Sequence, residues 1–324
     1  MNYRHAFHAG NFADVVKHAV LARILVHLRG KPAAFRVIDT HAGAGVYDLA
    51  GGEASRSGEW RAGIGRLLTA PIAPAVQPLL KPYVDVIASL NSAPTAPLVP
   101  TQAGVQGDES GQNQRSLDHG VLGNEQVADA SPGMESTLTI YPGSPVLARA
   151  FLRPQDRLVA CELEPKAYAL LAHHLARDRR VKTVAIDGWM ALNAYVPPSE
   201  RRGIVIVDPP FEEAQDFTRL AHGLEAAHRK WANGIYLLWY PIKGRQDADA
   251  LARRLKRSGI ARILRAELAV DATPPQGPLG GCGLIVLNPP WTLENELAAI
   301  LPELVKVLGS RNSNYRLDWI AGEN

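Results

Sequence analysis

The sequence predicts an α/β protein with a doubly wound, mostly parallel sheet. Strand-like apolar runs alternate with helix-like segments over most of the 324 residues, and this alternation is typical of parallel sheets with helical crossovers. Four of the strand-like runs end at carboxylates, which are Asp39, Glu162, Asp187 and Asp208. Because such sheets bind ligands at the carboxyl ends of their strands, these residues are candidates for a functional site.

The predicted elements follow the spacing of apolar residues along the chain. A helix is expected over 13–29, where apolar residues recur at helical intervals, and Gly30 with Pro32 ends it. The first buried strand, 37–40, opens into a glycine-containing turn. After residue 137 we expect strands at 158–161, 181–186, 203–207, 235–239, 263–270 and 284–287, and helices at 165–177 and through 217–224.

The chain divides into four predicted parts. Residues 1–46 form an amino-terminal arm, a helix and the first strand, and residues 47–90 form an inserted cap of short helices. Residues 138–324 complete the sheet-containing domain. Residues 91–137 are rich in Gly, Gln, Ser, Asn, Ala and Pro and contain no Phe, Trp or Tyr, so this segment cannot bury enough apolar surface to fold. We expect a flexible, acidic surface insertion whose deletion leaves the fold intact.

Composition excludes several classes of protein. The hydrophobic fraction of 46% and the charged fraction of 21% are typical of a globular chain rather than a disordered or collagen-like one. No apolar run approaches the roughly 18 residues of a membrane span. The start of the chain has no apolar signal region, so we expect a cytoplasmic protein. Cys161 and Cys282 each lie beside an apolar run and are expected to be buried small hydrophobes.

Charge is distributed unevenly along the chain. The insertion carries six carboxylates against the single Arg115, a net charge of −5, so the rest of a chain whose total is +3 carries +8. A basic body favours a polyanionic partner without identifying it.

The segment Asp39-Thr40-His41-Ala42-Gly43-Ala44-Gly45 places glycines directly after a strand. Glycine lets the backbone approach a nucleotide-like ligand closely, so we assign Gly43 to cofactor binding. The third glycine of a dinucleotide-binding fingerprint is missing, and the acidic residue expected about 20 positions later is replaced by the distant Glu162. A nicotinamide cofactor is therefore disfavoured.

The most informative motif is Asp208-Pro209-Pro210-Phe211, directly after the predicted strand 203–207. Proline disfavours the helical conformation of the residue before it, so the chain leaves the strand extended with Asp208 directed forward. The Asp208 carboxylate and the Pro209 carbonyl can then accept both hydrogens of an exocyclic amino group, and Phe211 offers a face on which a base can stack. The structural alternative is a loop that only ends a strand.

A second segment, Asn288-Pro289-Pro290-Trp291, has the same pattern of an acceptor, two prolines and an aromatic residue. It follows the last predicted strand, 284–287. If that strand is antiparallel, its end lies at the opposite edge of the sheet from Asp208. We therefore assign the reactive role to Asp208 and treat the second segment as structural.

The first of these motifs resembles the signature Asp/Asn/Ser-Pro-Pro-aromatic of class I S-adenosylmethionine-dependent methyltransferases that act on amino groups. More narrowly, the chain is similar to the large-subunit ribosomal RNA adenine-N6 methyltransferase family, the ribosomal RNA large subunit methyltransferase J family. Nearly the whole chain outside the insertion carries this resemblance, in Tyr3-Arg4-His5-x-Phe7-His8-Ala9-Gly10-Asn11, Asp14-x-x-Lys17-His18, the turn at 39–45, Tyr141-Pro142-Gly143-Ser144-Pro145 and Asp208-Pro209-Pro210. It implies a Rossmann-like class I methyltransferase fold, in which we expect an antiparallel last strand and a small inserted helical subdomain.

The resemblance also implies which residues form the site. S-adenosylmethionine is the implied cofactor, and Asp208 is the implied proton acceptor. Tyr3 is the implied RNA contact, and we assign Arg4 and Lys17 to substrate binding beside it. The implied cofactor contacts, position by position, are His18, His41, Ser144, Glu162, Asp187, Gly188 and Asp208.

The expected activity is N6-methylation of one adenosine in 23S ribosomal RNA, by base flipping and in-line methyl transfer. We expect 23S ribosomal RNA as partner, no membrane and no obligate protein partner. Two alternatives stay open: a DNA adenine or cytosine amino-methyltransferase, and a catalytically silent RNA-binding protein of the same fold. Two features depart from the family, namely Phe211, where tyrosine is usual, and the insertion at 91–137.

Histidines gather near the amino terminus at His5, His8 and His18. A His-x-x-His pair without cysteine or a nearby set of carboxylates is a poor zinc signature. We therefore predict no metal, and expect a folded arm that closes over cofactor and RNA.

Overall fold

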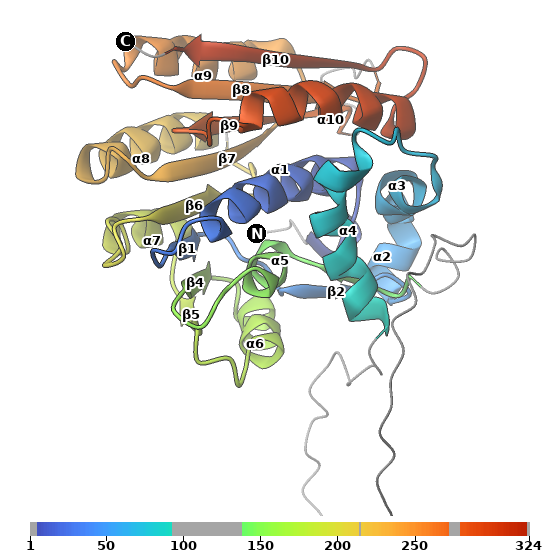
Figure 1. The fold of residues 1–324 in the computed structure, drawn as a ribbon, viewed down its shortest axis with the longest axis horizontal. Coiled ribbons are helices and arrows are strands. Elements are labelled where there is room, and N and C mark those ends of the chain that lie inside the picture. Colours follow the sequence, from blue (N-terminus) through green and yellow to red (C-terminus); the bar gives the residue numbers. More distant parts are fainter. Residues whose placement is uncertain (1–4, 93–137, 214, 272–278, 323–324) are drawn as a thin grey trace, which may run out of the picture.

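The computed structural model describes residues 5–92, 138–213, 215–271 and 279–322 (Figure 1). Tyr3 and Arg4 lie outside these ranges, as does most of the predicted acidic insertion. The central element is an eight-stranded sheet. Its strands are β1 (Arg36–Asp39), β4 (Arg157–Glu162), β5 (Val181–Ala185), β6 (Gly203–Val207), β7 (Ile235–Pro241), β8 (Ile263–Ala269), β9 (Gly281–Leu287) and β10 (Asn314–Ala321).

The strand order is β10-β8-β9-β7-β6-β1-β4-β5, and Figure 1 shows it from β10 at the top to β5 at the bottom. The five strands from β7 to β5 are parallel to one another. Strand β9 is antiparallel to both of its neighbours, and β10 is antiparallel to β8. The predicted doubly wound, mostly parallel sheet is therefore confirmed, and the predicted strand at 284–287 is antiparallel. It is not the last strand, because β10 follows it.

Helices cover both faces of the sheet. Helices α1 (Phe12–Arg29), α5 (Ser144–Ala150), α6 (Pro165–His174) and α10 (Leu293–Leu308) lie on one face, and α7 (Gly188–Ala194), α8 (Asp216–Lys230) and α9 (Arg245–Arg257) lie on the other. Adjacent residues of a strand point to opposite faces. Accordingly, Val37 packs with the first set of helices and Ile38 with the second.

Helix α1 is buried on almost every side. The side chain of Asn11 accepts hydrogen bonds from the backbone N–H groups of Ala13 and Asp14, which caps the helix start. The helix packs against the sheet, α4, α5 and α10, and such all-round burial explains why apolar residues occupy most of its positions. Within this apolar setting it also buries Asp14, Lys17 and His18.

The segment predicted as a cap of short helices contains α2 (Gly52–Ser57), a π-helix η2 (Arg61–Gly65), α3 (Arg66–Thr69) and α4 (Gln77–Ser92). These helices stand at the right of Figure 1. A short strand, β2 (Val46–Asp48), leads into them and pairs antiparallel with β3 (Ile140–Pro142), which the sequence did not predict. A 3-10 turn, η1 (His5–Phe7), begins the described chain.

Asn91 links the end of helix α4 to the start of strand β3 through its side chain. Its side-chain oxygen accepts from the backbone N–H groups of Thr139 and Ile140 at 2.9 Å each, and its side-chain nitrogen donates to the Ile140 carbonyl at 2.9 Å. The first two residues of the predicted insertion, Asn91 and Ser92, belong to α4. In the described parts of the chain, no helix has the length and apolar character to cross a bilayer.

Candidate active site

Four acidic residues lie at the carboxyl ends of parallel strands. Asp39 ends β1, Glu162 ends β4, Asp187 follows β5, and Asp208 follows β6. Strands β1 and β6 are neighbours. The next strand of the sheet after β1 in the chain is β4, on one side of this pair, and the next after β6 is β7, on the other side. Ligands of doubly wound sheets bind at such a switch point. The fold therefore brings together four residues that lie far apart in the sequence.

The Asp208 carboxylate is ion-paired with Lys17. The Lys17 Nζ donates to Asp208 Oδ2 at 2.5 Å and lies 2.8 Å from Asp14 Oδ1. The Lys17 side chain is only 5% exposed, and Asp208 is 14% exposed. Among the residues that the structure describes, Asp208 Oδ1 has no hydrogen-bond partner. One oxygen of Asp208 is thus held by Lys17, and the other is available to a ligand.

Asp14 completes this buried charge network from the first turn of α1. Its Oδ2 accepts from the backbone N–H of Gly10 at 2.9 Å and lies 3.1 Å from Nε2 of His5. Burial favours the neutral carboxyl, but the charges of Lys17 and His5 outweigh it and hold the pKa of Asp14 well below its usual range. Burial likewise opposes the charge on Lys17, and the two carboxylates nonetheless raise the pKa of its ammonium well above the usual value.

These contacts change the expectation for Lys17. We assigned it to substrate binding, yet its ammonium is enclosed between two carboxylates. Lys17 therefore lies where it can fix one carboxylate oxygen of Asp208, and its contact with substrate stays a prediction. Its partner Asp14 was not among the predicted site residues; the available signal was an acidic and a basic residue three positions apart within an apolar helix.

The chain turns sharply after Asp208. Pro209 is buried, and no described residue donates a hydrogen bond to its carbonyl. Phe211 adopts a left-handed backbone conformation, with φ of 52°, which is uncommon for a bulky residue and occurs preferentially at functional sites. Its half-buried ring lies 4.8 Å from that of Phe217 and 5.7 Å from that of Trp239, centroid to centroid. The Phe211 ring, on which we expect a base to stack, therefore packs against two other aromatic rings.

His18 lies one residue beyond Lys17 and is fully buried. Its Nδ1 shares a hydrogen bond of 2.7 Å with the Tyr141 hydroxyl, which is 2.8 Å from the Tyr83 hydroxyl. Its other nitrogen, Nε2, is buried without a partner in the described chain. Burial, followed by the charge of Lys17, lowers the pKa of His18 to about 3. The neutral ring therefore presents an unsatisfied polar atom, which a ligand can satisfy.

Asp39 is also fully buried. Its Oδ2 accepts a hydrogen bond of 2.7 Å from the Ser144 hydroxyl, while its Oδ1 has no partner within the described ranges. Burial is the main cause that raises the pKa of Asp39 to about 7, and the nearby charge of Asp208 raises it further. Ser144 is a predicted cofactor contact. For Asp39, the sequence predicts only that it ends a strand.

Glu162 organises the glycine turn. Its Oε2 accepts from the backbone N–H of Gly43 at 2.8 Å, and its Oε1 accepts from those of Leu163 and Glu164. Gly43 has φ of 62°, and a β-carbon there would collide with the Tyr47 hydroxyl. Each carboxylate oxygen accepts up to two hydrogen bonds, so Oε2 retains room for a ligand hydroxyl.

His41, Asp187 and Gly188 meet beside this turn. Asp187 Oδ1 caps α7 by accepting from the backbone N–H groups of Trp189 and Met190 at 3.0 Å each. His41 packs edge-on against Trp189, and a β-carbon at Gly188 would collide with the His41 ring. Burial lowers the pKa of His41 to about 4, which keeps the ring neutral at physiological pH.

The remaining histidines of the amino-terminal segment have separate partners. His5 contacts Asp14, His8 contacts Glu59 at 3.0 Å, and His18 contacts Tyr141. Of the described side chains, no three or more from His, Cys, Asp and Glu are grouped so that they could hold a metal ion.

The second Pro-Pro segment lies at the other edge of the sheet. Strand β9 runs antiparallel to β7, so Asn288 follows its end beside residues that precede β6 and β7, such as Arg202 and Asn233. The predicted separation of this segment from Asp208 is confirmed.

Comparison with known proteins finds a family model and two relatives that match this chain. A family model described as "Ribosomal RNA large subunit methyltransferase D, RlmJ" matches residues 32–117 and 130–321. A protein of Escherichia coli (strain K12) named "Ribosomal RNA large subunit methyltransferase J" is 35% identical to this chain over 324 residues, which cover 100% of both chains. A protein of the same name from Haemophilus influenzae is 34% identical with the same coverage.

One solved structure is similar over nearly its full length. Protein LPL1258 from Legionella pneumophila superimposes with a TM-score of 0.75 at 28% sequence identity. The match covers 96% of this chain and 98% of that chain. The order and direction of the strands described above are therefore those of an architecture that is also found in a solved structure.

Proposed function

This chain belongs to the RlmJ family of ribosomal RNA large subunit methyltransferases, and from that membership we propose that it transfers a methyl group from S-adenosylmethionine to N6 of an adenosine in 23S ribosomal RNA. The family resemblance of the sequence motifs is thereby confirmed. The observation that carries the proposed chemistry is the position of Asp208, ion-paired through one oxygen at the switch point of the sheet.

The substrate amino group needs two acceptors. The N6 lone pair of adenine is delocalised into the ring and is a poor nucleophile. Asp208 Oδ1 and the Pro209 carbonyl can each accept one N6 hydrogen, which favours a tetrahedral nitrogen and directs its lone pair toward the methyl donor. As the proton leaves N6, the Asp208 carboxylate accepts it.

Lys17 fixes the orientation of this acceptor. Its contact to Oδ2 leaves Oδ1 directed toward the substrate. Lys17 also pairs with Asp14, and one ammonium with two carboxylates leaves a net charge of −1 on the three groups. Preorganised polar groups of this kind lower the activation free energy because they do not reorganise during the reaction.

The residues of the site fit S-adenosylmethionine. Two buried polar atoms, His18 Nε2 and Asp39 Oδ1, lack partners among the described residues, and a bound cofactor can supply the missing hydrogen bonds. The cofactor supplies an electrophilic methyl group on a sulfonium sulfur. Glu162 at the end of β4 is suited to a ribose diol and Asp187 with Gly188 to the adenine edge. Ser144 acts through Asp39, and His41 packs beside Gly188.

The adenosine must leave its stack to reach Asp208. Base flipping costs a few kcal/mol, so a loop, bulge or helix end is a better target than a continuous duplex. Phe211, backed by Phe217 and Trp239, supplies the face on which the flipped base stacks. Tyr3 and Arg4 remain proposed RNA contacts outside the described residues, and we place the reaction in the cytoplasm.

Transfer of labelled methyl groups to protein-free 23S ribosomal RNA tests this function. We expect wild-type protein to label the RNA and not an equal mass of adenine-containing duplex DNA, and Asp208→Ala to lose at least 100-fold in rate. Asp85→Ala is the matched control, because it removes an exposed carboxylate that pairs with Lys81. Preferred labelling of DNA would instead support a DNA amino-methyltransferase. RNA binding without any binding of S-adenosylmethionine in calorimetry would support a catalytically silent protein.

A further inference from the structure

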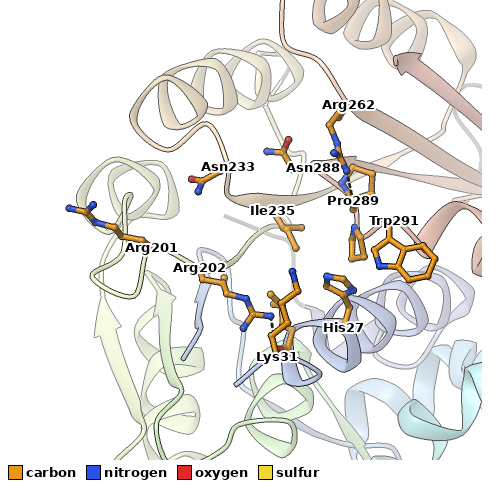
Figure 2. Close-up of a pocket in the computed structure, with 13 residues that line it drawn as sticks. His27, Lys31, Arg201, Arg202, Asn233, Ile235, Arg262, Asn288, Pro289 and Trp291 are labelled. Carbon is orange, nitrogen blue, oxygen red and sulfur yellow. Dashed lines mark hydrogen bonds between the residues drawn. The ribbon is translucent and has the colours of Figure 1, made fainter. Parts of the chain in front are cut away.

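A hollow lies at the amino-terminal edge of the parallel strands (Figure 2). It encloses about 540 Å³, a volume within the range of small-molecule sites. Gly203, the first residue of β6, lines it, whereas Asp208 follows the last residue of the same strand. A strand of this length spans about 17 Å. The hollow and the candidate active site are therefore at opposite edges of the sheet.

Positive charge dominates the walls of this hollow. Lys31, Arg201, Arg202 and Arg262 line it, and none of the lining residues carries a carboxylate. Lys31 and Arg201 are exposed, and neither side chain forms an ion pair with any described residue. Burial is the main cause that lowers the pKa of His27, another lining residue, and the charges of Lys31 and Arg202 lower it further. The hollow is thus an electropositive site.

An aromatic ring stands at its rim. Trp291 is 80% exposed, more than the other large hydrophobic residues that the described ranges leave at the surface. It follows Pro289 and Pro290, which are both buried, and it lines the hollow together with His27 (Figure 2). The two prolines restrict the backbone directly before Trp291, and its exposed ring offers a large face for stacking.

The backbone around the hollow is held in uncommon conformations. Five non-glycine residues in the described chain have positive φ, and three of them, Arg201 (52°), Arg262 (56°) and Asn288 (49°), line this hollow. The side chain of Asn288 fixes its own turn by donating to the carbonyls of Ala232 and Gly234 at 2.7 Å each. Residues in sparsely populated conformations cluster at ligand-binding sites.

We propose that this hollow is a second RNA-binding site, which takes a single-stranded segment of the same ribosomal RNA that is methylated at the active site. A base stacks on Trp291, and the adjoining phosphates bind Lys31 and Arg201. Cations beside an exposed aromatic ring form the usual combination for single-stranded nucleic acids. The second Pro-Pro segment then has a function of its own, which is to present Trp291. This proposal rests on the proposed function, because the substrate RNA supplies the ligand.

Binding of a fluorescently labelled single-stranded oligoribonucleotide, measured by anisotropy over a range of salt concentrations, tests the proposal. We expect Trp291→Ala to raise Kd about tenfold, as loss of one stacked base does. The double variant Lys31→Ala/Arg201→Ala should make the slope of log K against log salt shallower by about 1.4, which is the value for two phosphate contacts on a single strand. The matched control is Lys256→Ala/Arg257→Ala, which removes two exposed charges from the last turn of α9 and should leave Kd within twofold.

Ultraviolet cross-linking of the same complex locates the contact. We expect a cross-linked peptide that contains Trp291. Unchanged Kd and salt slope in both hollow variants, together with no cross-link to this peptide, would overturn the proposal. So would sedimentation data in which Trp291→Ala dissolves a dimer while RNA affinity stays constant, because the face would then bind a second copy of the chain.

These measurements need neither S-adenosylmethionine nor turnover. If wild-type protein transfers no methyl group to RNA and Trp291→Ala still weakens RNA binding, the proposed function fails and the second site stands. If methyl transfer proceeds and the hollow variants bind RNA normally, the second site fails alone.

Discussion

The ammonium of Lys17 lies 2.5 Å from the carboxylate of Asp208, although 191 positions separate the two residues in the sequence. Helix α1 precedes the first strand and packs beside the ends of strands that form much later in the chain, so an amino-terminal residue becomes part of the site. The contact connects the stability of the fold to the chemistry of Asp208, because a buried ion pair is costly to break from either side.

Replacing Lys17 should destabilise the protein strongly. Lys17→Met leaves the buried Asp14 and the partly buried Asp208 without their shared cation, and we expect the free energy of unfolding to fall by about 3–5 kcal/mol. Urea denaturation measures this change. Lys81→Met, which breaks the exposed pair with Asp85, should cost less than about 1 kcal/mol. Equal effects of the two substitutions would show that the buried network does not stabilise the fold.

Asp39 should make stability depend on pH. Its pKa is about 7 in the folded protein and near 4 when unfolded, so between these values folding takes up a proton and stability falls as pH rises. Asp39→Asn removes this dependence. The free energy of unfolding of Asp39→Asn minus that of wild type should therefore increase from pH 4 to pH 7, by at most about 1.4 kcal/mol per pH unit, and then level off. The exposed Asp85→Asn should give a flat difference, and a flat difference for Asp39→Asn would contradict the account.

Gly188 should tolerate no side chain. A β-carbon would collide with the His41 ring and the Thr40 carbonyl, so we expect Gly188→Ala to cost about 1–3 kcal/mol of stability through overpacking and to weaken the binding of S-adenosylmethionine at least tenfold. Thermal unfolding and calorimetry measure the two effects. Gly244→Ala is the control, because nothing lies within 4 Å of a β-carbon there. Normal cofactor affinity in Gly188→Ala would remove this residue from the site.

The stretch between α4 and β3 should be dispensable only if Asn91 is kept. A deletion of residues 94–136 with a short glycine linker retains the hydrogen bonds from Asn91 to Thr139 and Ile140, and we expect an unchanged melting temperature. Asn91→Ala in the full chain should lower it, since several backbone groups lose their partner. A large drop for the deletion alone would mean that the removed segment contributes to the fold.

Much of the sheet could be predicted from the sequence. The strand predicted at 203–207 coincides with β6, and the strand ends at Asp39, Glu162 and Asp208 lie where the alternation placed them, because continuous apolar runs bounded by polar residues are a strong signal for buried parallel strands. Strand β10 was missed because most of its residues are exposed or half-buried. An edge strand of this kind has no apolar run to reveal it.

Contacts between distant parts of the chain could not be predicted. Neither the pairing of Lys17 with Asp208 nor that of Asn91 with Ile140 has a local sequence signal, because each joins residues that are close only in the folded chain. The chain of hydroxyls from Tyr83 through Tyr141 to His18 is of the same kind. Motifs identify which residues carry chemistry, whereas the partners that orient those residues depend on tertiary packing.

Mass spectrometry of 23S ribosomal RNA, incubated with enzyme at saturating S-adenosylmethionine and digested to nucleosides, decides whether Asp208 orients an adenine amino group. With wild-type protein we predict that N6-methyladenosine appears and that no other methylated nucleoside increases. With Asp208→Ala, which removes both acceptor oxygens, the same product should form at least 100-fold more slowly. Formation of N6-methyladenosine by Asp208→Ala at the wild-type rate would contradict the role given to this carboxylate.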